Sequence, residues 1–211
     1  VTDSPYQMPE SGSEALPHRP VIAGFGPAGL FCALLLARAG YRPLILERGA
    51  DVDHRTTSVE QFWKNGILDT ESNIQFGEGG AGTFSDGKLN TLVKDACGRN
   101  HYVLKTFVEA GADPDILYVN KPHIGTDVLR NVVKHIRQEI LSLGGEVRFG
   151  CKVTDLKIKD QQLVGVCVNH TEEIPCEALV LAIGHSARDT FAMLHEHQIL
   201  MQPKSFAVGL R

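Results

Sequence analysis

Three glycines close to the N-terminal end have the spacing of a phosphate-binding turn, Gly24-x-Gly26-x-x-Gly29. Gly24 permits a tight turn, Gly26 lets a pyrophosphate approach the backbone, and Gly29 allows a helix to pack closely on a strand. Pro27 suits the first turn of a helix, where its missing N–H costs nothing. The free N–H groups at that end of the helix would face an anion. The spacing therefore predicts that the chain binds a dinucleotide through its phosphates.

Glu47 is the next residue with a candidate role, because it ends an apolar run and lies 23 positions after Gly24 (47 − 24). An acidic residue roughly 20 positions after the first glycine accepts hydrogen bonds from ribose hydroxyls. The same charge repels a 2′-phosphate, so NADP is disfavoured at this site. The alternative is a plain βαβ unit with a glycine-rich turn and a solvated Glu47.

A second glycine-rich stretch, residues 77–91, formally repeats the spacing as Gly77-x-Gly79-x-x-Gly82. No strand of adequate apolar character precedes it, and the residues that follow Gly82 make a poor helix start. We interpret the stretch as a loop that brings backbone close to a ligand, and not as a second nucleotide site. The alternative is a flexible surface loop.

Alternating strands and helices must position these residues. The sequence predicts one sheet with parallel strands near residues 20–24, 43–47 and 178–183. The composition of the third strand indicates burial on both faces. It ends at Gly184, and a ligand crevice is expected at the carboxyl ends of such strands. Three further strands are expected over residues 146–149, 152–158 and 163–168.

Helices are expected where apolar residues recur at helical spacing. The predicted ranges are 27–39, 100–110 and 126–143, with a short helix over 58–64 that Ser58 caps. Residues 1–19 contain prolines, serines and acids without apolar periodicity, and are expected to be a linker or tail. Val1 stands where a Met would initiate, and residues 206–210 are apolar just before the end. We therefore expect both ends to have been cut from a longer chain.

Composition limits the class of protein. The chain has 211 residues, of which 43% are hydrophobic and 22% charged, as in globular proteins. A net charge of −4 gives no reason to expect nucleic acid, and no apolar run approaches the roughly 18 residues of a membrane span. Five cysteines without a CxxC pair favour free thiols and a cytoplasmic location. The histidines form no metal-binding motif, so no metal is expected.

The order of these parts resembles the FAD-dependent oxidoreductases of the glutathione-reductase-like superfamily. Within it, residues 77–88 (GEGGAGTFSDGK) and 121–127 (KPHIGTD) resemble a family of bacterial-type FAD-dependent dehydrogenases, over about residues 20–211. The resemblance implies a truncated α/β fold, which consists of a Rossmann-like FAD-binding domain with a parallel sheet plus a three-stranded β-meander. Residues 20–92 and 125–188 would form the dinucleotide-binding domain. Residues 93–124 and 189–211 would be parts of an incomplete substrate domain.

The resemblance also implies site residues. The FAD pyrophosphate would lie against Gly24, Gly26, Pro27, Ala28 and Gly29. The adenosine ribose would lie at Glu47 with Arg48 beside it, and the adenine at Val153, while Gly184 would lie against the cofactor. The flavin side would be approached by Gly80, Gly82, Ser85 and Lys88. Such flavoproteins carry a late Gly-Asp strand end for the ribityl chain, and no such strand follows Gly184 here.

The function expected from the sequence is flavin-mediated hydride transfer as an FAD-dependent oxidoreductase, on a small molecule of unknown identity. Weak catalytic candidates are Lys88, His123 and His185. NAD(P)H is one candidate electron donor, with no second site visible for it. As a fragment, the chain is expected to show little turnover. The alternatives are a non-catalytic dinucleotide-binding module and a flavin-dependent RNA-modifying enzyme, although a basic patch is lacking.

Overall fold

The computed structural model describes residues 5–85, 87–89, 94–119 and 121–205. Within them, β1 (Val21–Ala23) is an interior strand of a parallel sheet. The strand order is β3-β2-β1-β7, with β2 at Leu44–Leu46, β3 at Glu146–Arg148 and β7 at Leu179–Leu181. Every pairing in this sheet is parallel. The prediction of parallel strands near residues 20–24, 43–47 and 178–183 is thus confirmed. Residues 206–210, the apolar stretch at the end, lie outside the described residues.

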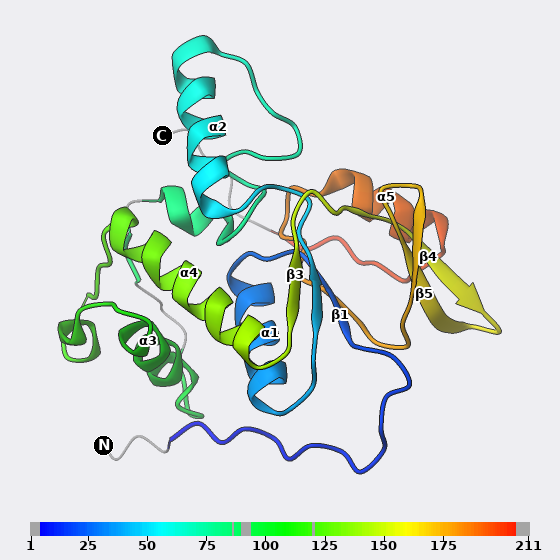
Figure 1. Cartoon of the computed structure of the whole chain (residues 1–211), viewed down its shortest axis with the longest axis horizontal. Helices are drawn as coiled ribbons and strands as arrows, with labels where there is room; N and C mark the ends of the chain where they lie inside the picture. Colours follow the sequence, from blue (N-terminus) through cyan, green and yellow to red (C-terminus); the bar gives the residue numbers. More distant parts are fainter. Residues whose placement is uncertain (1–4, 86, 90–93, 120, 206–211) are drawn as a thin grey trace.

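Alternate side chains of the sheet enter two separate cores, as the pleat requires. The two layers that hold these cores lie on opposite sides of the sheet (Figure 1). Ile22 and Ile45 face the helical layer, which consists of α1 (Pro27–Arg38), α3 (Arg99–Glu109) and α4 (Thr126–Ser142). Val21 and Leu44 face the opposite layer. That layer holds the antiparallel strands β4 (Val153–Lys159), β5 (Gln162–Val168) and β6 (Glu172–Pro175), with α5 (Arg188–Glu196). The described chain is therefore a Rossmann-like α/β fold with a separate three-stranded meander.

The membership of two strands differs from the expectation. Residues 146–148 pair with β2 in the parallel sheet, and Gly150 then turns the chain toward the meander with a φ of 62°. The third strand of the meander is β6, which the sequence analysis did not identify. Its sequence, Glu-Glu-Ile-Pro, contains only Ile174 as an apolar residue and so has too weak an alternation to predict a strand. Pairing with β5 decides its conformation.

The expectation that β7 is buried on both faces is wrong for the described residues. β7 forms the edge of the parallel sheet, and Val180 and Leu181 are 37% and 39% exposed. An apolar composition shows that a strand is suited to burial, but the position of the strand in the sheet determines how much of it is buried.

Helix α2 (Val52–Asn65) begins six residues before the predicted short helix. Its cap is Asp51, whose carboxylate accepts hydrogen bonds from the backbone N–H groups of Asp53 and His54. Ser58, the expected cap, lies inside the helix and donates to the carbonyl of His54. Gly66 ends the helix in the left-handed conformation. Two short 3-10 helices, η1 (Gly80–Phe84) and η2 (Pro114–Leu117), follow along the chain.

Candidate functional site

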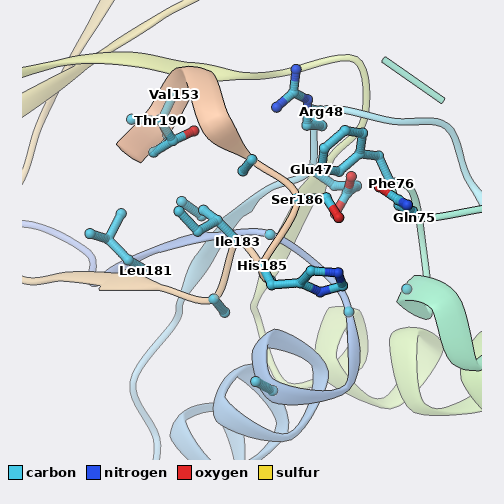
Figure 2. A pocket seen from close by; sticks show the side chains of 18 of the residues that line it. Glu47, Arg48, Gln75, Phe76, Val153, Leu181, Ile183, His185, Ser186 and Thr190 are labelled. Carbon is cyan, nitrogen blue, oxygen red and sulfur yellow. The ribbon is translucent and has the colours of Figure 1, made fainter. Parts of the chain in front are cut away.

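A cavity of about 610 Å³ lies at the carboxyl ends of β1, β2 and β7 (Figure 2). This is the edge where parallel α/β sheets bind ligands. Segments far apart in the sequence form its walls. They include Gly24, Gly26, Pro27, Ala28, Glu47, Arg48, Gln75, Phe76, Gly77, Gly80, Gly82, Cys151, Lys152, Val153, residues 181–187, Thr190 and Leu194. The structure therefore gathers most of the predicted cofactor-binding residues around one cavity.

The three glycines of the first motif have different structural roles. Gly24 has a φ of +99°, and a Cβ atom there would lie 2.5 Å from the carbonyl oxygen of Ala182. A Cβ on Gly29 would lie 1.9 Å from the carbonyl oxygen of Gly24. A Cβ on Gly26 would meet only Gly80, at an ordinary 3.6 Å. Packing alone thus excludes a side chain at Gly24 and Gly29, while the free space at Gly26 belongs to the cavity that it lines.

The N-terminus of α1 opens at this cavity. Gly26 is the N-cap and offers no side chain to the first N–H groups of the helix, and Pro27 occupies the first helical position. The N–H groups of the first turn have no partner within a helix, and the helix dipole adds positive charge there. The arrangement suits an anionic group such as a pyrophosphate.

Glu47 is 3% exposed and joins three loops through its carboxylate. One oxygen accepts the N–H of Phe25 at 2.6 Å, and the other accepts the N–H groups of Gly49 at 2.8 Å and Gly77 at 2.9 Å. A carboxylate has roughly four lone-pair sites, so some acceptor capacity remains beside the cavity. The glycine spacing predicts a ribose ligand for Glu47 but not this role in joining loops, because that role depends on residues 22 and 30 positions away.

Arg48 lies in a cluster of charged side chains at one end of the cavity, which we call the charged cluster: Arg48, Glu71, Lys152 and Asp189. Its guanidinium donates to both oxygens of Asp189 at 2.9 Å and to Glu71 at 2.9 Å. It also stacks on Phe76, 4.2 Å from the ring centroid, and Figure 2 shows these two side chains in the wall of the cavity. Lys152 donates to Glu71 at 2.9 Å. The hydrogen bonds from Arg48 lower the pKa of Asp189 to about 2, so Asp189 is ionised at neutral pH.

Arg55 is a buried residue that the sequence analysis missed. Its guanidinium donates to acceptors that all lie within residues 73–83, namely the carbonyls of Asn73, Ile74, Glu78 and Gly80 and the hydroxyl of Thr83. A Cβ on Gly77 would lie 2.5 Å from Cδ of Arg55. Burial lowers the pKa of Arg55 to about 10, and it stays charged at neutral pH. Arg55 thus fixes the glycine-rich wall of the cavity.

The three catalytic candidates do not converge on the cavity. Lys88 and His123 pair through an antiparallel bridge, and neither is among the described residues that line the cavity. His185 does line it (Figure 2). Ser85 donates to the carbonyl of Gly82 and also lies outside the lining. Val153 and Gly184 are both in the wall, at the start of β4 and after β7.

Two negative findings concern the described residues only. No group of three or more His, Cys, Asp or Glu residues is arranged there to hold a metal ion. Across the same residues, none of the helices has the length and apolar character needed to span a bilayer.

Comparisons with known proteins identify relatives and a fold. A Clostridium beijerinckii protein described as uncharacterized is 55% identical over 202 residues, which are 96% of this chain but 37% of that protein. The chain thus spans little more than a third of that relative's length. No family model matches.

Two solved structures share the fold at low sequence identity. THI4 of Thermovibrio ammonificans superimposes with a TM-score of 0.53 and 19% identity, covering 86% of this chain and 63% of that one. Glycine oxidase of Bacillus cereus superimposes with a TM-score of 0.52 and 13% identity, covering 85% and 59%. At such identities the likeness is one of fold.

Proposed function

We propose that this chain binds FAD through its ADP half and forms the cofactor-binding part of a flavin-dependent oxidoreductase. The observation that carries the proposal is the joint placement of two features at one cavity. The uncapped N-terminus of α1 at Gly26 suits the pyrophosphate, and Glu47 stands at the adjacent strand end, where an adenosine ribose is bound in this type of fold. The fold shared with glycine oxidase supports the oxidoreductase class.

The residues present suit the ADP half. Gly26 leaves room for the phosphates, and Glu47 keeps acceptor capacity toward the cavity for ribose hydroxyls. Val153 and Leu194 are buried apolar residues in the wall, which suits a flat adenine ring. When bound, the flavin would supply the hydride chemistry, while this chain would bind and orient the cofactor. His185 is the catalytic candidate nearest to this arrangement because it lines the cavity.

A ligand series tests the proposal. The protein is titrated calorimetrically with ADP, FAD and riboflavin, which has the flavin ring but no ADP part. We expect ADP and FAD to bind and riboflavin to show no measurable heat of binding. An absorbance spectrum after desalting the FAD mixture then reports whether the flavin is retained. Binding of riboflavin without binding of ADP, or of none of the three, would contradict the proposal.

A further inference from the structure

Two residues at the end of β2 imply opposite ligand preferences, one for a free ribose 2′-hydroxyl and the other for a 2′-phosphate. In dinucleotide-binding folds an acidic residue at this position binds the ribose 2′-hydroxyl, whereas a nearby arginine accommodates a 2′-phosphate. This chain has both, Glu47 followed directly by Arg48. The charge of Glu47 favours a free 2′-hydroxyl, but the sequence leaves open whether Arg48 is available to a ligand phosphate.

In the folded chain the donors of Arg48 are committed to carboxylates. Both terminal nitrogens bond to Asp189 in a bidentate pair, and Nε bonds to Glu71. Paired forks of this kind are the strong form of an arginine–carboxylate contact. The Arg48 side chain is 13% exposed and packed on the ring of Phe76, which fixes its plane. A ligand phosphate would have to compete with Asp189 for the terminal nitrogens.

The second cation of the charged cluster is committed in the same way. Lys152 lies 2.9 Å from Glu71 and 3.4 Å from Asp189, and it also lines the cavity. Two cations and two carboxylates leave the charged cluster with no net charge. Asp189 comes from the first turn of α5, 141 positions after Arg48, so the balance arises only on folding.

We propose that Asp189 and Glu71 determine specificity at this site. By neutralising Arg48 and Lys152 they leave no cation for a 2′-phosphate, so the cavity takes adenine dinucleotides with a free 2′-hydroxyl and rejects 2′-phosphorylated ones. The inference rests on the proposed dinucleotide site. It adds two residues, distant in sequence from the glycine motif, that act through Arg48 and Lys152 as positioning residues.

The test uses two ligands that differ only in the phosphate, ADP-ribose and ADP-ribose 2′-phosphate, titrated into the 211-residue protein. We expect the wild type to bind ADP-ribose at least about tenfold more tightly. Asp189→Asn, which retains the shape of the side chain, should reduce this ratio at least about tenfold by improving binding of the 2′-phosphate. Adding Arg48→Met to Asp189→Asn should restore the discrimination. Asp127→Asn, on the first turn of α4 and outside the cavity wall, is the matched control and should leave the ratio unchanged.

The outcomes separate the two proposals. If the wild type binds neither ligand, the dinucleotide site itself is wrong, and this inference falls with it. If the wild type binds ADP-ribose but Asp189→Asn leaves the ratio unchanged, the inference alone is overturned. Glu71→Gln is the second variant in case Asp189→Asn does not fold, as judged by circular dichroism. An unchanged ratio in a folded Glu71→Gln variant would also overturn it.

Discussion

At the scale of single residues, packing requires a glycine at position 29 but not at position 26. The missing side chain at Gly29 makes room for the carbonyl of Gly24, a backbone atom that cannot move aside cheaply. The space at Gly26 meets no such obstacle and opens on the cavity. The proposed pyrophosphate, which would approach the backbone here, would account for the absence of a side chain at Gly26.

Alanine substitutions should therefore have different effects at the two positions. Gly29→Ala should lower the free energy of unfolding by about 1–3 kcal/mol, the usual cost of overpacking. Gly26→Ala should cost about 1 kcal/mol or less, while weakening ADP at least about tenfold. Urea unfolding and calorimetry measure the two effects.

Gly125→Ala is the matched control for Gly26→Ala. Gly125 is also the N-cap glycine of a helix, and a Cβ there meets nothing within 4 Å. It should reproduce the small stability effect and leave ADP affinity intact. Equal ADP affinities for the Gly26 and Gly125 variants would argue against a pyrophosphate at Gly26.

Glu47 has a structural role and, in the proposed function, a role in ligand binding. Glu47→Ala would strand the buried N–H groups of Phe25, Gly49 and Gly77. We expect a loss of about 2 kcal/mol or more in unfolding free energy without ligand, since each unsatisfied buried group costs about 1–3 kcal/mol. FAD should also bind about 1.5–3 kcal/mol more weakly, the range for hydrogen bonds to a charged group.

The control for Glu47 is Glu60→Ala, an exposed acidic residue of α2. It should change neither quantity. Both measurements are made at a temperature where circular dichroism shows each variant to be folded. FAD affinity that survives Glu47→Ala would leave the carboxylate with a structural role only.

At the scale of elements, the Arg55 side chain of α2 supports the glycine-rich wall of the cavity. Arg55 projects from α2 into the loop before η1 and donates to acceptors spread over residues 73–83. The chain there is rich in glycine and would lose much conformational entropy on ordering. The buried guanidinium offsets this loss by satisfying several carbonyls at once.

Arg55→Lys should loosen this wall. Lysine places three donors at one point and cannot match the planar fork of arginine. Because stranded buried acceptors cost about 1–3 kcal/mol each, we expect a loss of about 3 kcal/mol or more. Hydrogen exchange should accelerate at residues 77–83 more than in β1, and ADP affinity should fall.

Arg99→Lys, at an exposed position on α3, provides the comparison for the same chemical change and should have no measurable effect. Uniform acceleration of exchange across the sheet would show that Arg55 stabilises the whole fold and not this wall in particular.

At the scale of the whole molecule, we propose that residues 1–211 supply the ADP half of an FAD site and little of the flavin half. Gly24 and Gly26 of the glycine motif, Glu47 and Val153 line the cavity, whereas Gly29 does not. β7 is the edge of the parallel sheet in the described residues, and its apolar side chains Val180 and Leu181 are partly exposed. Exposed apolar edges of this kind favour association between chains.

We therefore expect residues 1–211 to bind ADP about as tightly as FAD. Affinity would come from the pyrophosphate and adenosine, with little added by the isoalloxazine ring, and turnover would be slight. Calorimetric titration with both ligands measures this directly. A much higher affinity for FAD than for ADP would mean that residues 1–211 already enclose the flavin. The division into a dinucleotide-binding domain and parts of a substrate domain stays a prediction.

The β1-α1-β2 unit and the edge of the sheet where the cavity forms could be predicted from the sequence alone. These features depend on short-range spacing, apolar periodicity and the backbone freedom of glycine, which neighbouring residues settle. Glu47 was identifiable for the same reason, since it follows its motif at a fixed distance along the chain.

The partners of these residues become evident only in the folded chain. Residues 146–148 pair with β2 and residues 172–175 pair with β5, and the local sequence predicts neither pairing. Arg55 carries no motif, and its role appears once residues 73–83 fold over it. Arg48 meets Asp189 across 141 positions of sequence. Such contacts depend on how whole elements pack. Local sequence does not predict them, because the residues around one partner carry no information about the other partner.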